Sequence, residues 1–147
     1  MSKSEIPGDG FQGSGISELS TLLSRLNPIL LEDEFVFVTF LNQSYGDHSA
    51  LKPIASVQES EGLTLIISKS TADSENFEYH GVYRCISLSV HSSLTAVGLT
   101  AVVASKLADA DISANVIAGF YHDHIFVPLK KAIHAVKLLE QLNRPPS

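Results

Sequence analysis

The amino-acid sequence predicts an α+β protein with antiparallel sheet covered by helices on one face, and three observations indicate this class. Strand-like segments occur in two groups separated along the chain, with helix-like segments between them. There is no long series of strand–helix crossovers of the kind that a parallel sheet requires. No glycine pattern of the dinucleotide-binding type follows a strand. With 147 residues the chain can bury one ordinary core, or two small cores that support each other.

The first group of elements follows a glycine-rich start. Residues 1–15 combine four glycines with Ser, Asp and Pro, and they cannot bury enough surface to offset their ordering entropy, so we expect a mobile tail. Leucines at helical spacing over residues 19–26 then predict a short amphipathic helix. Ser17 can cap this helix, and Pro28 disturbs its end.

Three strands are expected in the remainder of the first group. Residues 34–41 (EFVFVTFL) are rich in aromatic and β-branched residues, which favours a strand. Residues 53–57 and 63–68 predict a hairpin around Glu61-Gly62. Residues 71–80 are polar and acidic, and they are consistent with a short helix or a loop.

The second group of elements has the order β-α-β-β-α. It begins with a strand over residues 83–90, followed by a helix that Ser92 or Ser93 caps and that runs to Ala110. Strands over residues 115–121 and 124–129 are then joined by a tight turn at His122-Asp123. A helix over residues 130–142 ends the group. This order belongs to the ferredoxin-like class but lacks the final strand of a complete unit. Because an unpaired sheet edge must be covered, we expect the first group to supply that strand and the two halves to interlock.

Composition excludes several classes of partner. The formal net charge of −6 is spread along the chain and there is no basic stripe, so a nucleic-acid partner is not expected. Cys85 is the only cysteine, which excludes an intramolecular disulfide and fits a reducing, cytoplasmic compartment. The longest apolar-leaning stretch, residues 94–103, is interrupted and short of the roughly 20 residues that span a membrane. We therefore expect no membrane association.

Gly98-Leu99 stands at the start of the second helical region, the connection Ile112-Ser113-Ala114-Asn115 follows it, and a hairpin comes next. With these features residues 90–127 resemble an ACT domain, the amino-acid-sensing module of aspartokinases and related regulatory proteins. The first half is similar only in its order of elements and in Pro53-Ile54-Ala55. The whole chain resembles small bacterial tandem-ACT proteins without an enzyme domain. This implies a tail at residues 1–15, ACT-type modules at residues 16–81 and 82–143, and a short tail at residues 144–147.

The resemblance also implies a ligand site and a function. A helix start offers unpaired N–H groups to a carboxylate, and Gly98 allows a ligand or a neighbouring backbone to come close. Family members often carry an acid where this chain has Asn115, so an uncharged amide here weakens the binding of an ammonium group. The implied ligand-binding residues are Ala96, Val97, Gly98, Leu99, Asn115, Phe120, Tyr121 and His122. The expected protein is a non-catalytic, homodimeric regulator that binds an amino acid or similar metabolite and needs no cofactor.

Two other functions remain open at this stage. The first is a ligand-free interaction module that assembles through its sheet edges. The second, weaker one is a metal-binding protein or enzyme centred on His122 and His124, with Asp123 or His91 as a third ligand. Ser92 and Ser93 beside His91 superficially resemble a nucleophile and base, but helix capping explains them better. Cys85 lies in an apolar strand, which favours a buried hydrophobe over an activated thiol.

Overall fold

The computed structural model describes residues 15–89 and 97–143, and the structural statements below refer to these residues. In chain order the elements are α1 (Gly15–Ser24), β1 (Pro28–Leu41), the 3₁₀ turn η1 (Ser49–Leu51), β2 (Ala55–Gln58), β3 (Gly62–Ser68), α2 (Lys69–Ser74), β4 (Tyr83–Leu88), α3 (Leu99–Ala108), β5 (Asn115–Ala118), β6 (Asp123–Pro128), the 3₁₀ turn η2 (Leu129–Lys131) and α4 (Ala132–Leu142). The strands form one six-stranded antiparallel sheet in the order β2-β3-β1-β4-β6-β5. This confirms the predicted antiparallel α+β class.

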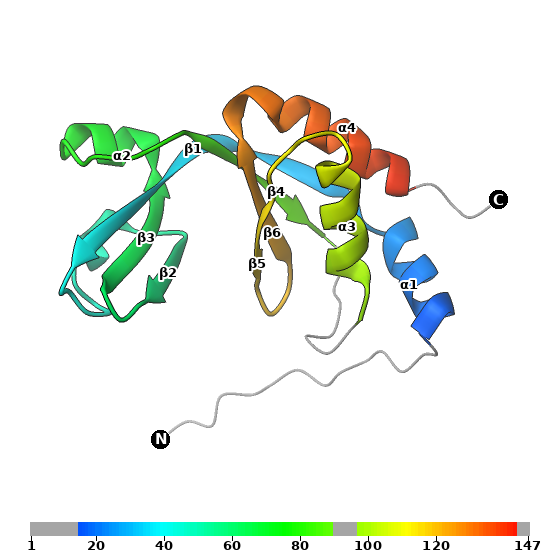
Figure 1. Ribbon diagram of the computed structural model, residues 1–147, viewed down its shortest axis with the longest axis horizontal. Coiled ribbons are helices and arrows are strands. Elements are labelled where there is room, and N and C mark those ends of the chain that lie inside the picture. The colour runs from blue at the N-terminus through cyan, green and yellow to red at the C-terminus, as the bar shows by residue number, and fades with distance from the viewer. Residues whose placement is uncertain (1–14, 90–96, 144–147) are drawn as a thin grey trace, which may run out of the picture.

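The two halves of the chain share the strands at the middle of the sheet. The carboxyl-terminal part of β1 pairs with β3, and its amino-terminal part pairs with β4. In the second half, β1 therefore lies beside β4 and supplies the strand that the order β-α-β-β-α lacks. The start of β4 also reaches the first half, because Tyr83 pairs with Phe35 of β1. The predicted interlocking is confirmed, and Figure 1 shows β1 running through both halves.

A bulge bends β1 where the two halves meet. Leu30 pairs with Ile86 and Glu34 pairs with Arg84, so three residues of β1 face one residue of β4. The Arg84 guanidinium spans the irregularity by donating from Nε and Nη2 to the Leu31 carbonyl, at 3.1 and 2.6 Å. Extra residues in one strand bend it and increase its local twist. The sheet accordingly curls, as Figure 1 shows.

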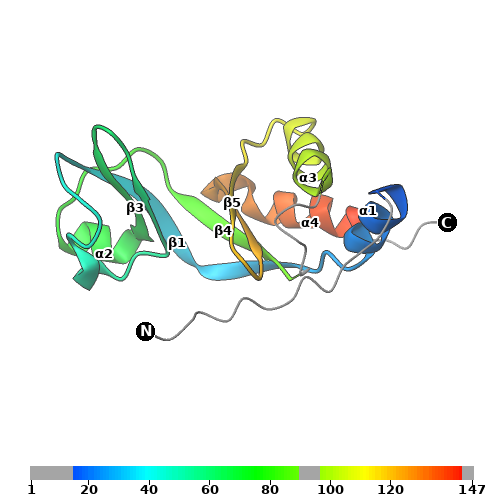
Figure 2. The ribbon, with the colours of Figure 1, turned by 90° about the horizontal axis from the view of Figure 1, so that it is seen from below.

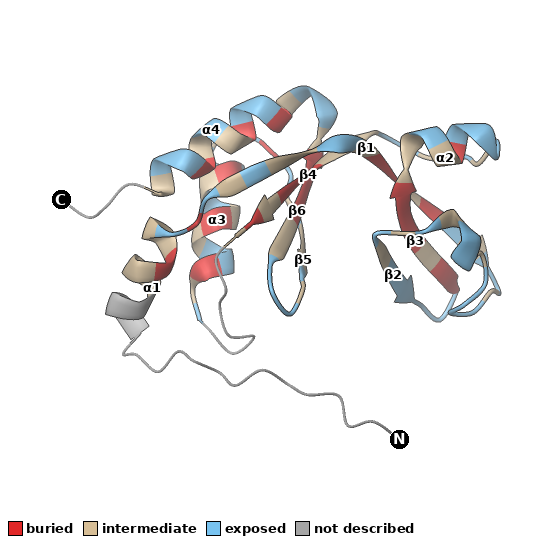
Figure 3. Ribbon diagram, turned by 180° about the vertical axis from the view of Figure 1, so that it is seen from behind, coloured by how far each residue is buried: buried red, intermediate tan, exposed pale blue. Residues whose placement is uncertain are grey.

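Helices cover the two ends of the sheet separately. At the second half, α1, α3 and α4 pack on one face of β4 and β6 and bury the largest core, with Ile86, Ile125 and Leu139 fully buried. At the first half, α2 covers Val36, Leu65 and Ile67. Figure 2 shows α2 at one end of the molecule and the other three helices at the opposite end. The buried positions in Figure 3 follow the strands and the inward sides of α3 and α4.

The opposite face of the sheet has no helix in the described part of the chain. Its centre is a third cluster, in which Phe35, Ile66, Cys85 and Phe126 are buried and Leu31, Phe37, Ala55, Tyr83 and Ile117 are partly buried. Phe126 contacts Phe35 and Phe37 edge-on, with ring centroids 5.7 and 5.8 Å apart. A flat sheet would leave such residues open to solvent. They are buried because the curl brings the side chains of both halves together on the inside of the bend.

Three predicted elements differ from the structure. β1 begins at Pro28 rather than at residue 34, because a proline at the first position of a strand loses no ladder hydrogen bond. The helix α3 begins at Leu99, several residues after the predicted serine caps. The β5–β6 turn is longer than His122-Asp123, since Ala118 pairs with Asp123 and the Gly119 N–H donates to the His122 carbonyl at 2.9 Å.

Candidate ligand site

The start of α3 is built on a glycine. Gly98 is the residue that precedes the helix, and its φ of 101° lies in the left-handed region. Its carbonyl accepts the Val102 N–H at 3.0 Å, which closes the first helical turn. The sequence prediction that Gly98 lies within a helix begun by Ser92 or Ser93 is therefore wrong. Both serines, with His91 and Ala96, lie outside the described residues.

Gly98 is required for two structural reasons that do not involve a ligand. A side chain is strained at its positive φ wherever the added atom points. A Cβ built there would also come within 3.3 Å of the Leu19 Cδ2 atom of α1. The glycine thus fits both the turn into α3 and the contact with the Leu19 side chain of α1.

The start of α3 nevertheless has backbone N–H groups that receive no side-chain hydrogen bond from the cap residue Gly98. The first N–H groups of an α-helix have no partner within the helix, and together they carry a partial positive charge. Gly98 has no side chain to accept from them, and no acidic residue occupies the first turn of α3. Leu99 is buried in the core, whereas Val97 is 88% exposed and Thr100 is exposed. The main chain rather than the side chains of these residues is the group that can bind an anion.

Asn115 lies at the first position of the edge strand β5, and its side chain is exposed. Its Nδ2 donates to the Phe126 carbonyl at 3.3 Å across the β5–β6 pair. This bond orients the amide on the helix-free face of the sheet, where Asn115 is paired with Phe126. The Oδ1 atom is an acceptor that can bind an N–H or an ammonium group.

The β5–β6 turn, residues 119–122, contains the three aromatic residues that the sequence analysis predicted to bind the ligand. Phe120 and Tyr121 are 40% and 59% exposed, and their rings meet edge-on with centroids 5.3 Å apart. His122 is exposed and its carbonyl closes the turn. In Figure 1 this turn lies at the same end of the second half as the start of α3.

The structure does not bring all the predicted residues together. Gly98 precedes the first turn of α3, whereas Asn115 follows the connection that leaves its last turn. Ten helical residues span roughly 15 Å. Figure 1 shows the start of α3 and the start of β5 at opposite ends of this half. A small ligand that contacts both Gly98 and Asn115 must therefore contact one of them in the second ACT module of another copy.

The histidine-rich turn does not form a metal centre in the described part of the chain. No group of three His, Cys, Asp or Glu side chains is close enough there to hold an ion. Asp123 and His124 are consecutive residues of β6, so they point to opposite faces of the sheet. Burial raises the pKa of the Asp123 carboxyl above its ordinary value, and the nearby His124 opposes this only in part. A contribution from His91 is outside the described residues.

Cys85 is buried, as the sequence predicted. Burial raises the pKa of its thiol to about 11, although a backbone hydrogen bond from Ile125 acts in the opposite direction. A thiolate is the reactive form, and a raised pKa suppresses it at neutral pH. The residue therefore serves as a small hydrophobe in the third cluster.

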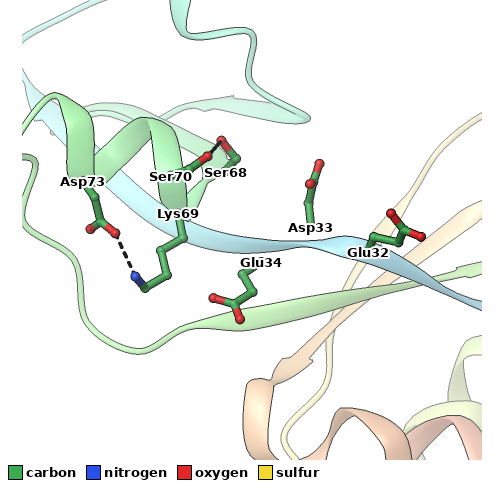
Figure 4. A pocket seen from close by; sticks show the side chains of 7 residues that line it. All are labelled: Glu32, Asp33, Glu34, Ser68, Lys69, Ser70 and Asp73. Carbon is green, nitrogen blue, oxygen red and sulfur yellow. Dashed lines mark hydrogen bonds and ion pairs between the residues drawn. The ribbon is translucent and has the colours of Figure 1, made fainter.

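One acidic hollow was not found from the sequence. Glu32, Asp33 and Glu34 of the β1 bulge line a space of about 370 Å³ with the start of α2. Lys69 and Asp73 of α2 form an ion pair at 2.7 Å on its other side. Figure 4 shows Asp33 and Glu34 extending to opposite sides of β1, so the carboxylates do not converge on one point. The signal in the sequence is the acidic triplet, but the strand predicted over residues 34–41 leaves Glu32 and Asp33 outside it.

Two family models with the description ACT domain match the chain in tandem, over residues 14–84 and residues 81–141. The chain belongs to the ACT domain family, whose domains are regulatory rather than catalytic, and the resemblance seen in the sequence is confirmed. Among curated proteins, none matches the chain. No helix in the described residues has the length and apolar character needed to cross a membrane.

Solved structures have the same fold. A Vibrio cholerae protein of unknown function, described as a possible transport protein, is 44% identical, with a TM-score of 0.80 over 89% of this chain and 100% of its own. An Agrobacterium tumefaciens protein is 14% identical, with a TM-score of 0.67 over 81% of this chain and 90% of its own. The regulatory subunit of aspartate kinase from Thermus flavus is 10% identical, with a TM-score of 0.62 over 80% and 97%. At such low identity the last two show the fold alone.

Proposed function

We propose that this protein is a cytoplasmic, non-catalytic sensor that binds an amino acid or a similar small carboxylate at the start of α3. The observation that carries the proposal is the helix start itself, where Gly98 supplies no side chain to the first N–H groups and the first turn has no acid. A helix start of this kind binds carboxylates through its N–H groups and its partial charge. The regulatory character of ACT domains supports a binding role.

The second part of the proposed site comes from another ACT module. Because Asn115 lies about one helix length from Gly98 in the same chain, we place the ligand between two copies of the protein. The α3 start of one copy binds the carboxylate, and Asn115 Oδ1 of the other accepts from the ligand's ammonium group. Phe120, Tyr121 and His122 line the α3 side of this site in the proposal, since their turn lies at that end of the module.

A thermal-shift screen of the twenty amino acids and of divalent metals tests this function. A ligand that binds only the native state raises its melting temperature in a concentration-dependent way. We expect at least one amino acid to stabilise the protein and the metals to have no effect. A shift with a metal alone would support the histidine-centred alternative instead, and no shift with any of them would support an interaction module without a ligand.

Thr100 provides a sharper variant than Gly98, because Gly98 is also required by its backbone conformation. Thr100 is exposed in the first turn of α3, so Thr100→Glu places a carboxylate where the ligand's carboxylate would bind. An acid there also favours the helix, so the variant should fold. We expect Thr100→Glu to weaken binding at least tenfold, about 1.4 kcal/mol, and Thr100→Gln to bind like the wild type. Calorimetry with the amino acid found in the screen measures this, and equal binding by both variants would contradict the site.

The interaction-module alternative has one observation in its favour. The edge strand β5 is short and uncharged, and its residues are exposed or half-buried. An edge without charge or proline can add a strand from another chain. In that case assembly would occur without any small molecule, and a substitution at Thr100 would have no effect on it.

A further inference from the structure

The two halves of the chain repeat one arrangement of strands. In each half the first strand lies in the middle of the sheet, the third strand pairs with it and the second strand forms the edge, which gives β1, β3 and β2 in one half and β4, β6 and β5 in the other. The helices α2 and α4 follow the third strands, α4 after the turn η2. Residues 42–54, which join β1 to β2, therefore correspond to the part of the second half that contains α3.

The backbone N–H groups of this joining segment bond to side chains of the same half. The segment contains the 3₁₀ turn η1 in place of an α-helix. The Ser44 N–H donates to Oδ2 of the Asp47 carboxylate at 2.9 Å, and the Tyr45 N–H donates to Oε1 of Gln58 at 2.7 Å. At the start of α3, by contrast, Gly98 provides no side-chain acceptor and the first turn has no acid. Oxygen atoms of the chain itself thus bind the N–H groups of the first half.

The Gln58 amide joins this segment to the β2–β3 turn. Gln58 is the last residue of β2, and its Nε2 atom donates to the carbonyls of Gln43, Glu59 and Gly62 at 3.1, 3.3 and 3.2 Å. The two N–H groups of Nε2 are shared among these three acceptors. Since Oε1 accepts from Tyr45, both ends of the amide are bonded to the protein even though the residue is exposed.

The corresponding position in the second half cannot make this link. Ala118 is the last residue of β5, as Gln58 is the last residue of β2, and each takes part in the last pair of its hairpin. Both lie on the helix-covered face, because Leu63 opposite Gln58 and Val116 two residues before Ala118 pack in the helix-covered cores. The alanine methyl group forms no hydrogen bond. An amide therefore crosses this end of the first half, and none crosses the same end of the second.

We propose that Gln58, together with Asp47, closes the first half to small carboxylates, so that each chain binds such a ligand only through its second half. The proposal rests on the carboxylate site proposed at the start of α3 and adds its selectivity between the two halves. Gln58 Oε1 lies where a carboxylate oxygen would accept from the Tyr45 N–H. The Asp47 carboxylate accepts from the next N–H along the chain and repels a second negative charge.

Acetate is a probe that reports on both halves in one experiment. In NMR spectra of the isotope-labelled full chain, acetate up to about 100 mM should shift the amide signals of Leu99 and Thr100 and leave that of Tyr45 unchanged. Asp47→Asn is the matched control, because it removes the negative charge and keeps an acceptor oxygen. When Gln58→Ala is added to Asp47→Asn, the Tyr45 amide should exchange with solvent at least about tenfold faster and should shift with acetate. Circular dichroism establishes that both variants are folded.

Two results would overturn the proposal. One is a wild-type protein in which acetate shifts Tyr45 as strongly as Leu99 and Thr100, because the first half would then be open. The other is a double variant in which the Tyr45 amide does not respond to acetate, whether or not it exchanges faster, because Gln58 would then only hold the loop in place. A response of Tyr45 in the double variant, without any response of Leu99 and Thr100 in the wild type, would contradict the α3 site and still support closure by Gln58.

Discussion

Gly98 combines two constraints that sequence spacing does not separate. Its place in the resemblance to ACT domains suggests close approach of a ligand, whereas its φ of 101° and its position under Leu19 require glycine for the fold. A positive φ depends on how the chain enters α3, and no local residue pattern predicts it. The sequence therefore identified an important residue for an incomplete reason.

Replacing Gly98 should destabilise the protein even when the new side chain is small. A non-glycine residue in the left-handed region costs about 1–2 kcal/mol, so Gly98→Ala should lower the melting temperature by several degrees. This differs from simple packing against a helix, where alanine would be tolerated. The double variant Gly98→Ala with Leu19→Ala separates the two causes in thermal melts. If Gly98→Ala does not lower the melting temperature of the Leu19→Ala protein, the cost of the alanine in the wild type is steric and not conformational.

Asp123 should make stability depend on pH. Because burial raises the pKa of this carboxyl in the folded state above the ordinary value of 3.8, the folded protein binds more protons than the unfolded chain between those two values. The contribution of Asp123 to the free energy of unfolding therefore falls as the pH rises through this window. Asp123→Asn should melt at a higher temperature than the wild type at about pH 7 and at a similar temperature at about pH 3. A variant that is less stable at neutral pH would show that the ionised carboxylate makes a favourable contact.

At the scale of elements, the sequence predicted the type and order of most helices and strands but missed where some of them begin. The apolar and β-branched runs of β3, β4 and β6 and the helical spacing of α4 are local signals, and the structure confirms these elements. The predicted strand begins at Glu34 rather than at Pro28, because the bulge places the charged Glu32 and Asp33 inside β1 and these residues interrupt the apolar pattern. α3 was begun too early because Ser92 and Ser93 have the chemistry of helix caps, whereas the structure uses Gly98.

The candidate site was predictable only in part. The start of α3 and the β5–β6 turn could be recognised from the resemblance, and they lie at one end of the second half. The separation of Asn115 from Gly98 could not be predicted from the sequence. It depends on the direction in which α3 runs along the sheet and on the return of the chain into β5. Spacing in the sequence places Gly98 before one helix and Asn115 after it. It does not show that one small ligand cannot contact both residues of a single copy.

The shared strands predict that the second half will not fold alone. A fragment of residues 81–143 lacks the β1 segment that pairs with β4, Leu22 of α1 and Leu26, which follows α1; both leucines are buried in the core of the second half. We expect this fragment to show no cooperative thermal transition. Residues 15–36 joined to it by a flexible linker should restore one, since they return both the strand and the helix. A sharp, reversible transition of residues 81–143 alone would contradict the interlocked fold.

At the scale of the whole molecule, the curled sheet organises the three clusters. Helices at the two ends bury separate cores, and the bend buries the third cluster between Phe35 and Phe126 without a helix from residues 15–89 or 97–143. Cys85 and Tyr83 belong to this third cluster, so the middle strands have apolar residues on both faces. Strands with two buried faces lose the simple alternation of half-buried strands. This explains why the sequence predicted a sheet covered on one face and did not predict the inside of the bend.

The division of β1 between β3 and β4 also has a consequence for synthesis. Translation releases β1 and its partner β3 before β4, so the Pro28–Leu30 end of the strand remains unpaired while the second half is still being made. The nascent chain thus exposes an apolar strand end until residues 83–88 have left the ribosome, and such exposed edges are prone to aggregation. A product that terminates after α2 would keep that end unpaired permanently. Quality control in the cell would then act on truncated chains of this protein as on unfolded ones.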